Sequence, residues 1–216
     1  MKRYHLGWRS RGRTASTACT GDVCASSSIT LRCPAAFGGT FVIFTFLAPI
    51  LTEVTGVGNG TLSIALVIFG GATVVGNFAG GELTDKIGTS RTMVTTLIGL
   101  IASFVLVALA MRRSGNSGGL AIWGILGFAI PPIMQDGVVK VARAVAPDAV
   151  ATASGMNVSA FNLGISGGSF IGGRVVEGPG LTATPYAAIA FAVVALGITI
   201  LIGKSQTPRA GESVAS

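Results

Sequence analysis

Three short stretches of the chain hold the residues whose types and spacing could do chemistry. The segment from Glu82 to Arg91 contains two carboxylates and two cations. Asp136 and Lys140 are four residues apart with the acid first, the spacing at which opposite charges pair on one helix. Uncharged hydrogen-bonding residues form the third stretch, at Asn157, Ser159, Asn162 and Ser166. These groups can form ion pairs and hydrogen bonds, but they are not a set of acid, base and nucleophile.

The histidine and the cysteines of the chain are confined to its N-terminal segment. The single histidine is His5, which leaves no histidine-dependent triad or metal cluster for the rest of the chain. Cys19, Cys24 and Cys33 have spacings that match no zinc or haem signature. We therefore expect the protein not to be an enzyme, and we expect no metal and no cofactor.

Long apolar runs separate the polar stretches. Half of the 216 residues are hydrophobic and 11% are charged, against about 25% charged in a typical soluble domain. The runs 61–79 and 92–111 have no ionisable residue, and each is about the roughly 20 residues that cross a bilayer as a helix. Because backbone groups in lipid need internal partners, we expect an all-α membrane fold, a six-transmembrane-helix bundle. The predicted spans are 36–54, 61–81, 92–111, 119–141, 150–173 and 184–203, with 82–91 as a tight turn.

The basic residues indicate how this bundle is oriented. Residues 1–34 are rich in arginine and serine without an apolar run, and we expect a disordered or non-native tail before the bundle at 35–203. Residues 204–216 are predicted to be a disordered cytoplasmic tail. Of the 15 lysines and arginines, twelve fall on one predicted face and three on the other, Arg112, Arg113 and Arg174. This bias predicts a multi-pass protein of the cell (inner or plasma) membrane with both termini cytoplasmic, and it explains the net charge of +7 without nucleic acid.

The polar residues within the spans leave alternatives open. Asp136 and Lys140 fit an interfacial ion pair or a role in coupling. Asn157 and Asn162 are five residues apart and cannot share one narrow stripe of a helix; each fits either a helix–helix contact or a substrate contact. Gln135 follows Pro131-Pro132, which we expect to interrupt its helix, and broken helices often line transport pathways.

Glycines recur at helical spacing in two of the spans. Gly164, Gly168 and Gly172 form one stripe in the fifth span, and Gly76 and Gly80 form another in the second. Small residues at this spacing let two helices approach closely in a membrane. We predict that both stripes are helix-packing faces.

The charged segment also resembles a known motif. Gly81-x-x-x-Asp85-Lys86-x-Gly88 followed by Arg91 is similar to the signature loop of the major facilitator superfamily. Thr89 and Ser90 stand where that loop has two further basic residues. The stretches 44–49 and 157–164 extend the resemblance to the C-terminal six-helix half of the drug/proton-antiporter branch, especially its arabinose or sugar efflux permease-like members.

The resemblance implies a fold and a function. Two six-helix bundles would surround a central cavity and alternate between inward-open and outward-open states, exporting a sugar or a small drug-like solute. The loop residues Gly81, Asp85, Lys86, Gly88 and Arg91 would act as a conformational latch. The residues that we predict as substrate contacts are Phe44, Gln135, Asn157 and Asn162.

The resemblance also implies partners. Besides the lipid bilayer and a small-molecule substrate, we expect a second six-helix half or a second copy of this chain, because one bundle supplies half of a cavity. The chain is therefore expected to be a truncated half of a transporter. The alternative is a non-transporting membrane fragment or an assembly partner of a larger permease.

Overall fold

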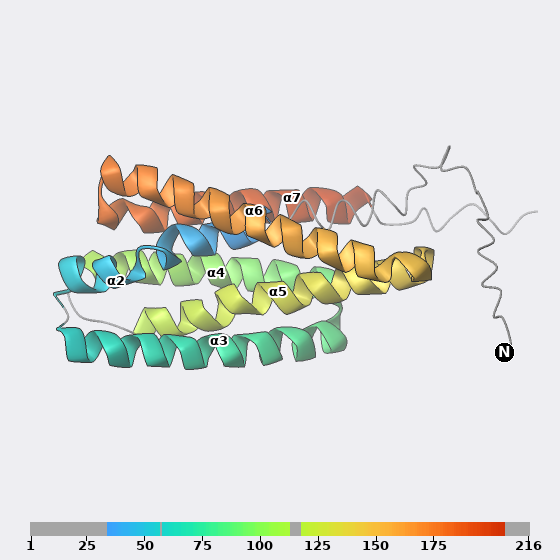
Figure 1. The fold of residues 1–216 in the computed structure, drawn as a ribbon, viewed down its shortest axis with the longest axis horizontal. Coiled ribbons are helices and arrows are strands. Elements are labelled where there is room, and N and C mark those ends of the chain that lie inside the picture. The colour runs from blue at the N-terminus through green and yellow to red at the C-terminus, as the bar shows by residue number, and fades with distance from the viewer. Residues whose placement is uncertain (1–33, 57, 113–117, 206–216) are drawn as a thin grey trace, which may run out of the picture.

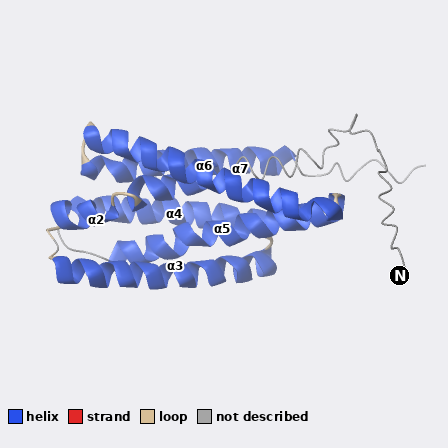
Figure 2. Ribbon diagram, viewed as in Figure 1, coloured by secondary structure: helices blue, strands red, loops and turns tan. Residues whose placement is uncertain are grey.

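The computed structural model describes residues 34–56, 58–112 and 118–205, and in these ranges every regular element is helical (Figures 1 and 2). The predicted N-terminal tail lies outside the described residues, apart from Pro34, and so does the C-terminal tail from residue 206. The elements are a helix over Pro34–Phe44, α2 Leu47–Pro49, a π-helical turn Ile50–Val54, α3 Asn59–Ile87, α4 Thr89–Arg112, α5 Gly118–Val145, a short 3₁₀ turn Pro147–Ala149, α6 Val150–Glu177, a second 3₁₀ turn Leu181–Ala183 and α7 Thr184–Ser205. The prediction of an all-helical membrane fold is confirmed.

The long helices run side by side along one axis (Figure 1). The helix Pro34–Phe44 lies in the middle of the bundle, where its Phe37 ring contacts the rings of Phe128 on α5 and Phe161 on α6. Its Gly39 lies against the Ala188 carbonyl of α7. Helix α5 also packs against α3 and α4. The core thus forms around the first helix, and the later helices enclose it.

Not every long helix in the described ranges is apolar enough to cross a membrane. Four are, namely α3, α4, α5 and α7. The helix Pro34–Phe44 and the segment Leu47–Val54 form a pair bent by 46°, which makes a fifth span if the two are counted together. The remaining long helix, α6, has 28 residues but does not reach the same apolarity. The six predicted segments are therefore present as helices, but the fifth of them is not an ordinary lipid-facing span.

The predicted tight turn over 82–91 is wrong. Helix α3 continues to Ile87 and α4 begins at Thr89, so that Gly88 alone links them. Nothing between residues 82 and 87 breaks a helix, and the Lys86 ammonium pairs with the Glu82 carboxylate one turn earlier at 2.7 Å. Gly88 ends the helix because its φ of +83° is open to glycine, and its N–H donates to the Thr84 carbonyl.

The predicted interruption at Pro131-Pro132 is also wrong. Both prolines lie inside the continuous helix α5. Their flanks are held in the core, where Ile130, Ile133 and Met134 are buried, and membrane helices tolerate proline when neighbouring helices support them. The break in the bundle occurs instead at Thr45 and Phe46, between the two parts of the bent first span.

Candidate functional site

A stripe of polar side chains runs along α6. Ser159, Asn162, Ser166 and Ser169 follow one another at separations of three and four residues, which places them on one face of the helix. We call these four residues the polar stripe. Its first three members are exposed, and Ser169 is half-buried. The Asn162 amide donates to the Val158 carbonyl at 3.0 Å, a bond within α6.

A second exposed face of α6 is apolar. Met156, Leu163 and Phe170 recur every seven residues and are 58%, 70% and 71% exposed. By the angular repeat of a helix they stand next to the polar stripe and not within it. The Ser159 hydroxyl, like the Asn162 amide, donates within α6, to the Gly155 carbonyl at 3.0 Å. Hydrocarbon can cover the apolar face at no cost, whereas the hydrogen-bonding capacity that remains on a row of exposed amide and hydroxyl groups is costly to place in lipid. The two outward faces of α6 therefore suit different surroundings.

The third face of α6 carries the glycines and packs on the first helix. A Cβ atom on any of the three predicted glycines would come within 3 Å of its backbone: Gly164 at 2.9 Å from Pro34, Gly168 at 2.2 Å from the Gly38 carbonyl oxygen and Gly172 at 2.8 Å from the Val42 carbonyl oxygen. Contacts this short require glycine. The close packing fixes the rotation of α6 and hence the direction in which the polar stripe points.

The other predicted glycine pair brings α3 against α5. A Cβ atom on Gly76 would lie 2.2 Å from the Ile125 carbonyl oxygen, and one on Gly80 would lie 2.6 Å from the Ala129 carbonyl oxygen. The hydroxyl of Thr84, one turn further, is buried and donates to the Gly80 carbonyl at 2.7 Å. This packing holds the end of α3 that carries the charged residues close to α5.

The break in the first span lies beside one end of the polar stripe. The hydroxyls of Thr45 and Ser169 are 2.8 Å apart, a hydrogen bond in which either can donate. The neighbouring Phe44 is 36% exposed and turns toward the other side of the bundle, where its ring contacts Phe69 and Phe128 at centroid distances of 5.6 and 5.9 Å. Phe44 is therefore at the edge of an aromatic cluster and not beside Asn162.

Two other predicted substrate residues contact each other inside the bundle. The Asn157 amide donates to the Gln135 side-chain oxygen at 2.7 Å, joining α6 to α5. Asn157 has no exposed surface, while Gln135 is half-buried. Of the two roles left open for Asn157, the helix–helix contact is the one present here. The four predicted residues thus occupy three places: this buried pair, the exposed Asn162 and the aromatic edge at Phe44.

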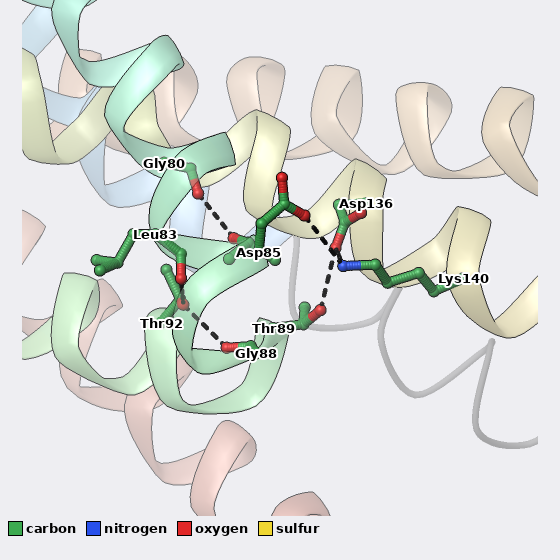
Figure 3. Close-up of polar contacts among 9 residues, drawn as sticks. Gly80, Leu83, Asp85, Gly88, Thr89, Thr92, Asp136 and Lys140 are labelled. Atoms are coloured by element: carbon green, nitrogen blue, oxygen red, sulfur yellow. Dashed lines mark hydrogen bonds and ion pairs between the residues drawn. The ribbon is translucent and has the colours of Figure 1, made fainter.

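The charged residues form a small cluster at one end of the bundle, where α3, α4 and α5 meet (Figure 3). Lys140 lies 2.8 Å from the Asp136 carboxylate on its own helix and 3.5 Å from the Asp85 carboxylate at the end of α3. The Thr89 hydroxyl donates to Asp136 at 3.3 Å. The interfacial ion pair predicted from the i,i+4 spacing is therefore present, and it also connects three helices.

The members of the predicted latch loop occupy different positions. Asp85 reaches across to α5, but Lys86 pairs with Glu82 on its own helix, and Arg91 is exposed near the start of α4. The cation that meets Asp85 is Lys140, which was not predicted as part of the latch. The spacing of Asp136 and Lys140 was the available signal for their pairing, but it carried no sign of the link to Asp85. These pairs are solvent-exposed, so each is worth only about 0–1 kcal/mol.

Comparison with known proteins completes the description of the site. Residues 35–215 match the family model described as Major Facilitator Superfamily. The chain is 36% identical over 170 residues to "Uncharacterized MFS-type transporter YtbD" of Bacillus subtilis (strain 168), which covers 79% of this chain and 42% of that protein. It is 28% identical over 170 residues to "Inner membrane transport protein YdhP" of Escherichia coli (strain K12), covering 78% of this chain and 43% of that one.

A further relative is named for a different function. The chain is 29% identical over 177 residues to "Transcription regulatory protein OpdE" of Pseudomonas aeruginosa, covering 80% of this chain and 42% of that protein. The chain thus spans less than half the length of each of these three curated relatives.

Proposed function

The chain belongs to the Major Facilitator Superfamily and is a multi-pass membrane protein, and from this premise we propose that it forms half of a pathway that moves a small solute across a cell membrane. The observation that carries the proposal is the polar stripe of α6. A helix of this length with exposed Ser159, Asn162 and Ser166 is poorly suited to lipid on that side. We infer that this side faces a water-filled path.

The chemistry of the polar stripe bears on the class of solute. Hydroxyl and amide groups both donate and accept hydrogen bonds, and the stripe contains no charged side chain. Such a surface suits a neutral solute with several hydroxyl groups. We therefore propose a sugar as the substrate, with a small drug-like solute as the other class, exported by alternating access. Asn162 is the proposed contact, and the Asn157–Gln135 hydrogen bond holds α6 against α5 behind it.

A second bundle is part of this proposal. A path needs walls on more than one side, and the polar stripe lies on the outside of this bundle. We propose that a second six-helix half, or a second copy of this chain, covers it. The apolar face with Leu163 and Phe170 would remain toward the lipid.

The charged cluster has a proposed role as a latch. Lys140 joins the ends of α3 and α5 through Asp85 and Asp136, with bonds weak enough to break during a conformational change. We propose that the cluster is at the cytoplasmic end of the bundle, since Lys86, Arg91, Lys140 and Arg143 all belong to this end. Both termini would then be cytoplasmic, in the inner or plasma membrane.

Cysteine accessibility tests the proposed path. In a background with Cys19, Cys24 and Cys33 replaced by serine, single cysteines replace Ser159, Asn162 or Ser166, and Met156, Leu163 or Phe170 as the matched set. With protein in proteoliposomes, a charged methanethiosulfonate reagent is expected to label the polar-stripe cysteines at least tenfold faster than the apolar set. Equal rates for the two sets would contradict a water-filled path on that side.

Solute movement is measured separately. Proteoliposomes with the chain, alone or with a coexpressed second half, are assayed with radiolabelled arabinose as the sugar probe and ethidium as the drug-like probe. Flux of either probe, lowered by Asn162→Ala, supports the proposal. No flux with either arrangement, together with equal labelling rates, would rule it out.

A non-transporting role is the second candidate. One matched relative is named a transcription regulatory protein, and the chain spans less than half of each relative. In that case the chain would be an assembly partner of a larger permease. Affinity purification from membranes would then recover a full-length permease, and purification without one would exclude this role.

A further inference from the structure

Two buried polar side chains meet without a hydrogen-bond partner where the first helix crosses α5. The Thr40 hydroxyl and the Trp123 indole N–H are each inaccessible to solvent, and neither has a hydrogen-bond partner among the described residues. Two other buried threonines, Thr84 and Thr199, bond to a carbonyl of their own helix. Thr40 differs from them in this respect. A buried unpaired group of this kind is unfavourable, because it has lost its hydrogen bonds to water without gaining others.

Both groups lie beside Gly127 of α5. A Cβ atom built on Gly127 would lie 3.1 Å from the Thr40 hydroxyl oxygen and 3.5 Å from the Trp123 indole nitrogen. The two polar atoms are therefore close to the same bare backbone position. The indole ring also contacts the Phe69 ring at 4.8 Å and the Phe104 ring at 6.3 Å between centroids.

The donor and acceptor types of the two groups are complementary to one small ligand. The indole N–H only donates, while a hydroxyl both donates and accepts. A molecule that accepts from Trp123 and donates to Thr40 would satisfy both, and it must be small because both residues are fully buried. Water meets these requirements, since a buried water needs two to four polar partners.

We propose that Thr40, Trp123 and Gly127 form a binding site for a single structural water molecule. The water accepts a hydrogen bond from the Trp123 indole and donates one to the Thr40 hydroxyl. It joins the central helix to α5 one turn before the break at Thr45. The proposal does not depend on transport, because the site is within the bundle and away from the polar stripe.

Nuclear magnetic resonance of the indole N–H tests this site. The full chain with ¹⁵N-tryptophan is prepared in lipid nanodiscs with Trp8→Phe, which leaves Trp123 as the only indole. We expect a magnetisation-transfer peak between the Trp123 indole proton and water. The peak is expected to be lost in Gly127→Ala, whose methyl group would crowd the space beside both polar atoms, and in the nearly isosteric Thr40→Val.

The control is Thr199→Val, which removes a buried hydroxyl bonded within its own helix to the Ala195 carbonyl at 2.7 Å. That variant should keep the water peak. Absence of the peak in the parent protein would overturn the proposal. So would a peak that survives Gly127→Ala but not Thr40→Val, since it would indicate a direct bond between Trp123 and Thr40. If Gly127→Ala does not fold, a peak that is unchanged in Thr40→Val would equally overturn it.

Discussion

The buried Asn157–Gln135 hydrogen bond shows how a polar residue in a membrane protein can serve packing. Two amides that could each bind a solute instead satisfy one another across α5 and α6 at 2.7 Å. In such pairs the net contribution is small, because each amide can also find partners when the helices separate. The role of this polar pair is therefore to fix the register between α5 and α6 more than to add stability.

Replacing either amide should destabilise the fold modestly. We expect Asn157→Ala and Gln135→Ala each to lower the free energy of unfolding in detergent by about 0.5–1.5 kcal/mol. The double variant should lose less than the sum of the two, because the shared bond is lost only once. Asn162→Ala, whose amide bonds within its own helix, is the control and should change little. Strict additivity of the two losses would show that the bond does not stabilise the protein.

The backbone conformation at Gly88 by itself requires glycine. Its φ of +83° and ψ of +153° fall in a region that is nearly closed to residues with a Cβ atom. We expect Gly88→Ala to lower the unfolding free energy by about 1–3 kcal/mol, measured by thermal or denaturant unfolding in detergent. Gly60→Ala, at a helical site with open space around it, should not destabilise the protein. An equal effect of the two changes would mean that the turn at Gly88 is not strained by a side chain.

At the scale of helices, spacing predicted which segments are helical but not where they end. The six segments were recognisable because apolar runs of about 20 residues with few or no charges are rare outside membranes. The ends of α3 could not be predicted, since its last turn is made of charged residues that also suit a loop. The i,i+4 pairing of Glu82 with Lys86 favours a helix there, but charged residues are equally well solvated in a turn.

Helix packing in α6 can be tested with two adjacent glycines. Gly168→Ala puts a methyl group 2.2 Å from the Gly38 carbonyl oxygen, so the helices must move apart. We expect a loss of about 1–3 kcal/mol in the free energy of unfolding, as for other overpacked positions. Gly167→Ala has open space around its Cβ position and should be neutral or slightly stabilising. A stable Gly168→Ala protein would show that this contact is looser than described.

The sidedness of polar groups along α6 was only partly predictable. The offset between Asn157 and Asn162 follows from the 3.6-residue repeat, and one is indeed buried while the other is exposed. Which of them faced inward depended on the glycine stripe packing against the first helix. That contact is between segments far apart in sequence, and spacing within one helix carries no information about it.

At the scale of the whole molecule, the distribution of basic residues predicts which end of the bundle faces the cytoplasm. In a background without native cysteines, Ser90→Cys in the first turn of α4 should be protected from an impermeant thiol reagent added to intact cells. It should react once the cells are permeabilised. Thr182→Cys, at the turn between α6 and α7, should react from outside. The reverse pattern would invert the proposed topology.

Long-range charge contacts were the part of the molecule that the sequence could not reveal. The i,i+4 pair Asp136–Lys140 was predictable, but its meeting with Asp85 depends on how α3 and α5 pack. That packing rests on Gly76 and Gly80, whose partners Ile125 and Ala129 have no distinguishing sequence feature. The spans could therefore be predicted from composition, while the connections between them required the structure.

The single-residue junction at Gly88 has a mechanical consequence. Because Gly88 alone links α3, of 29 residues, to α4, of 24 residues, the end of α3 and the start of α4 must stay together whenever either helix moves. A rearrangement of the bundle therefore needs another position at which the angle between two helical segments can change. The discontinuity at Thr45 and Phe46, where helical order lapses and the axis turns by 46°, is suited to be that pivot.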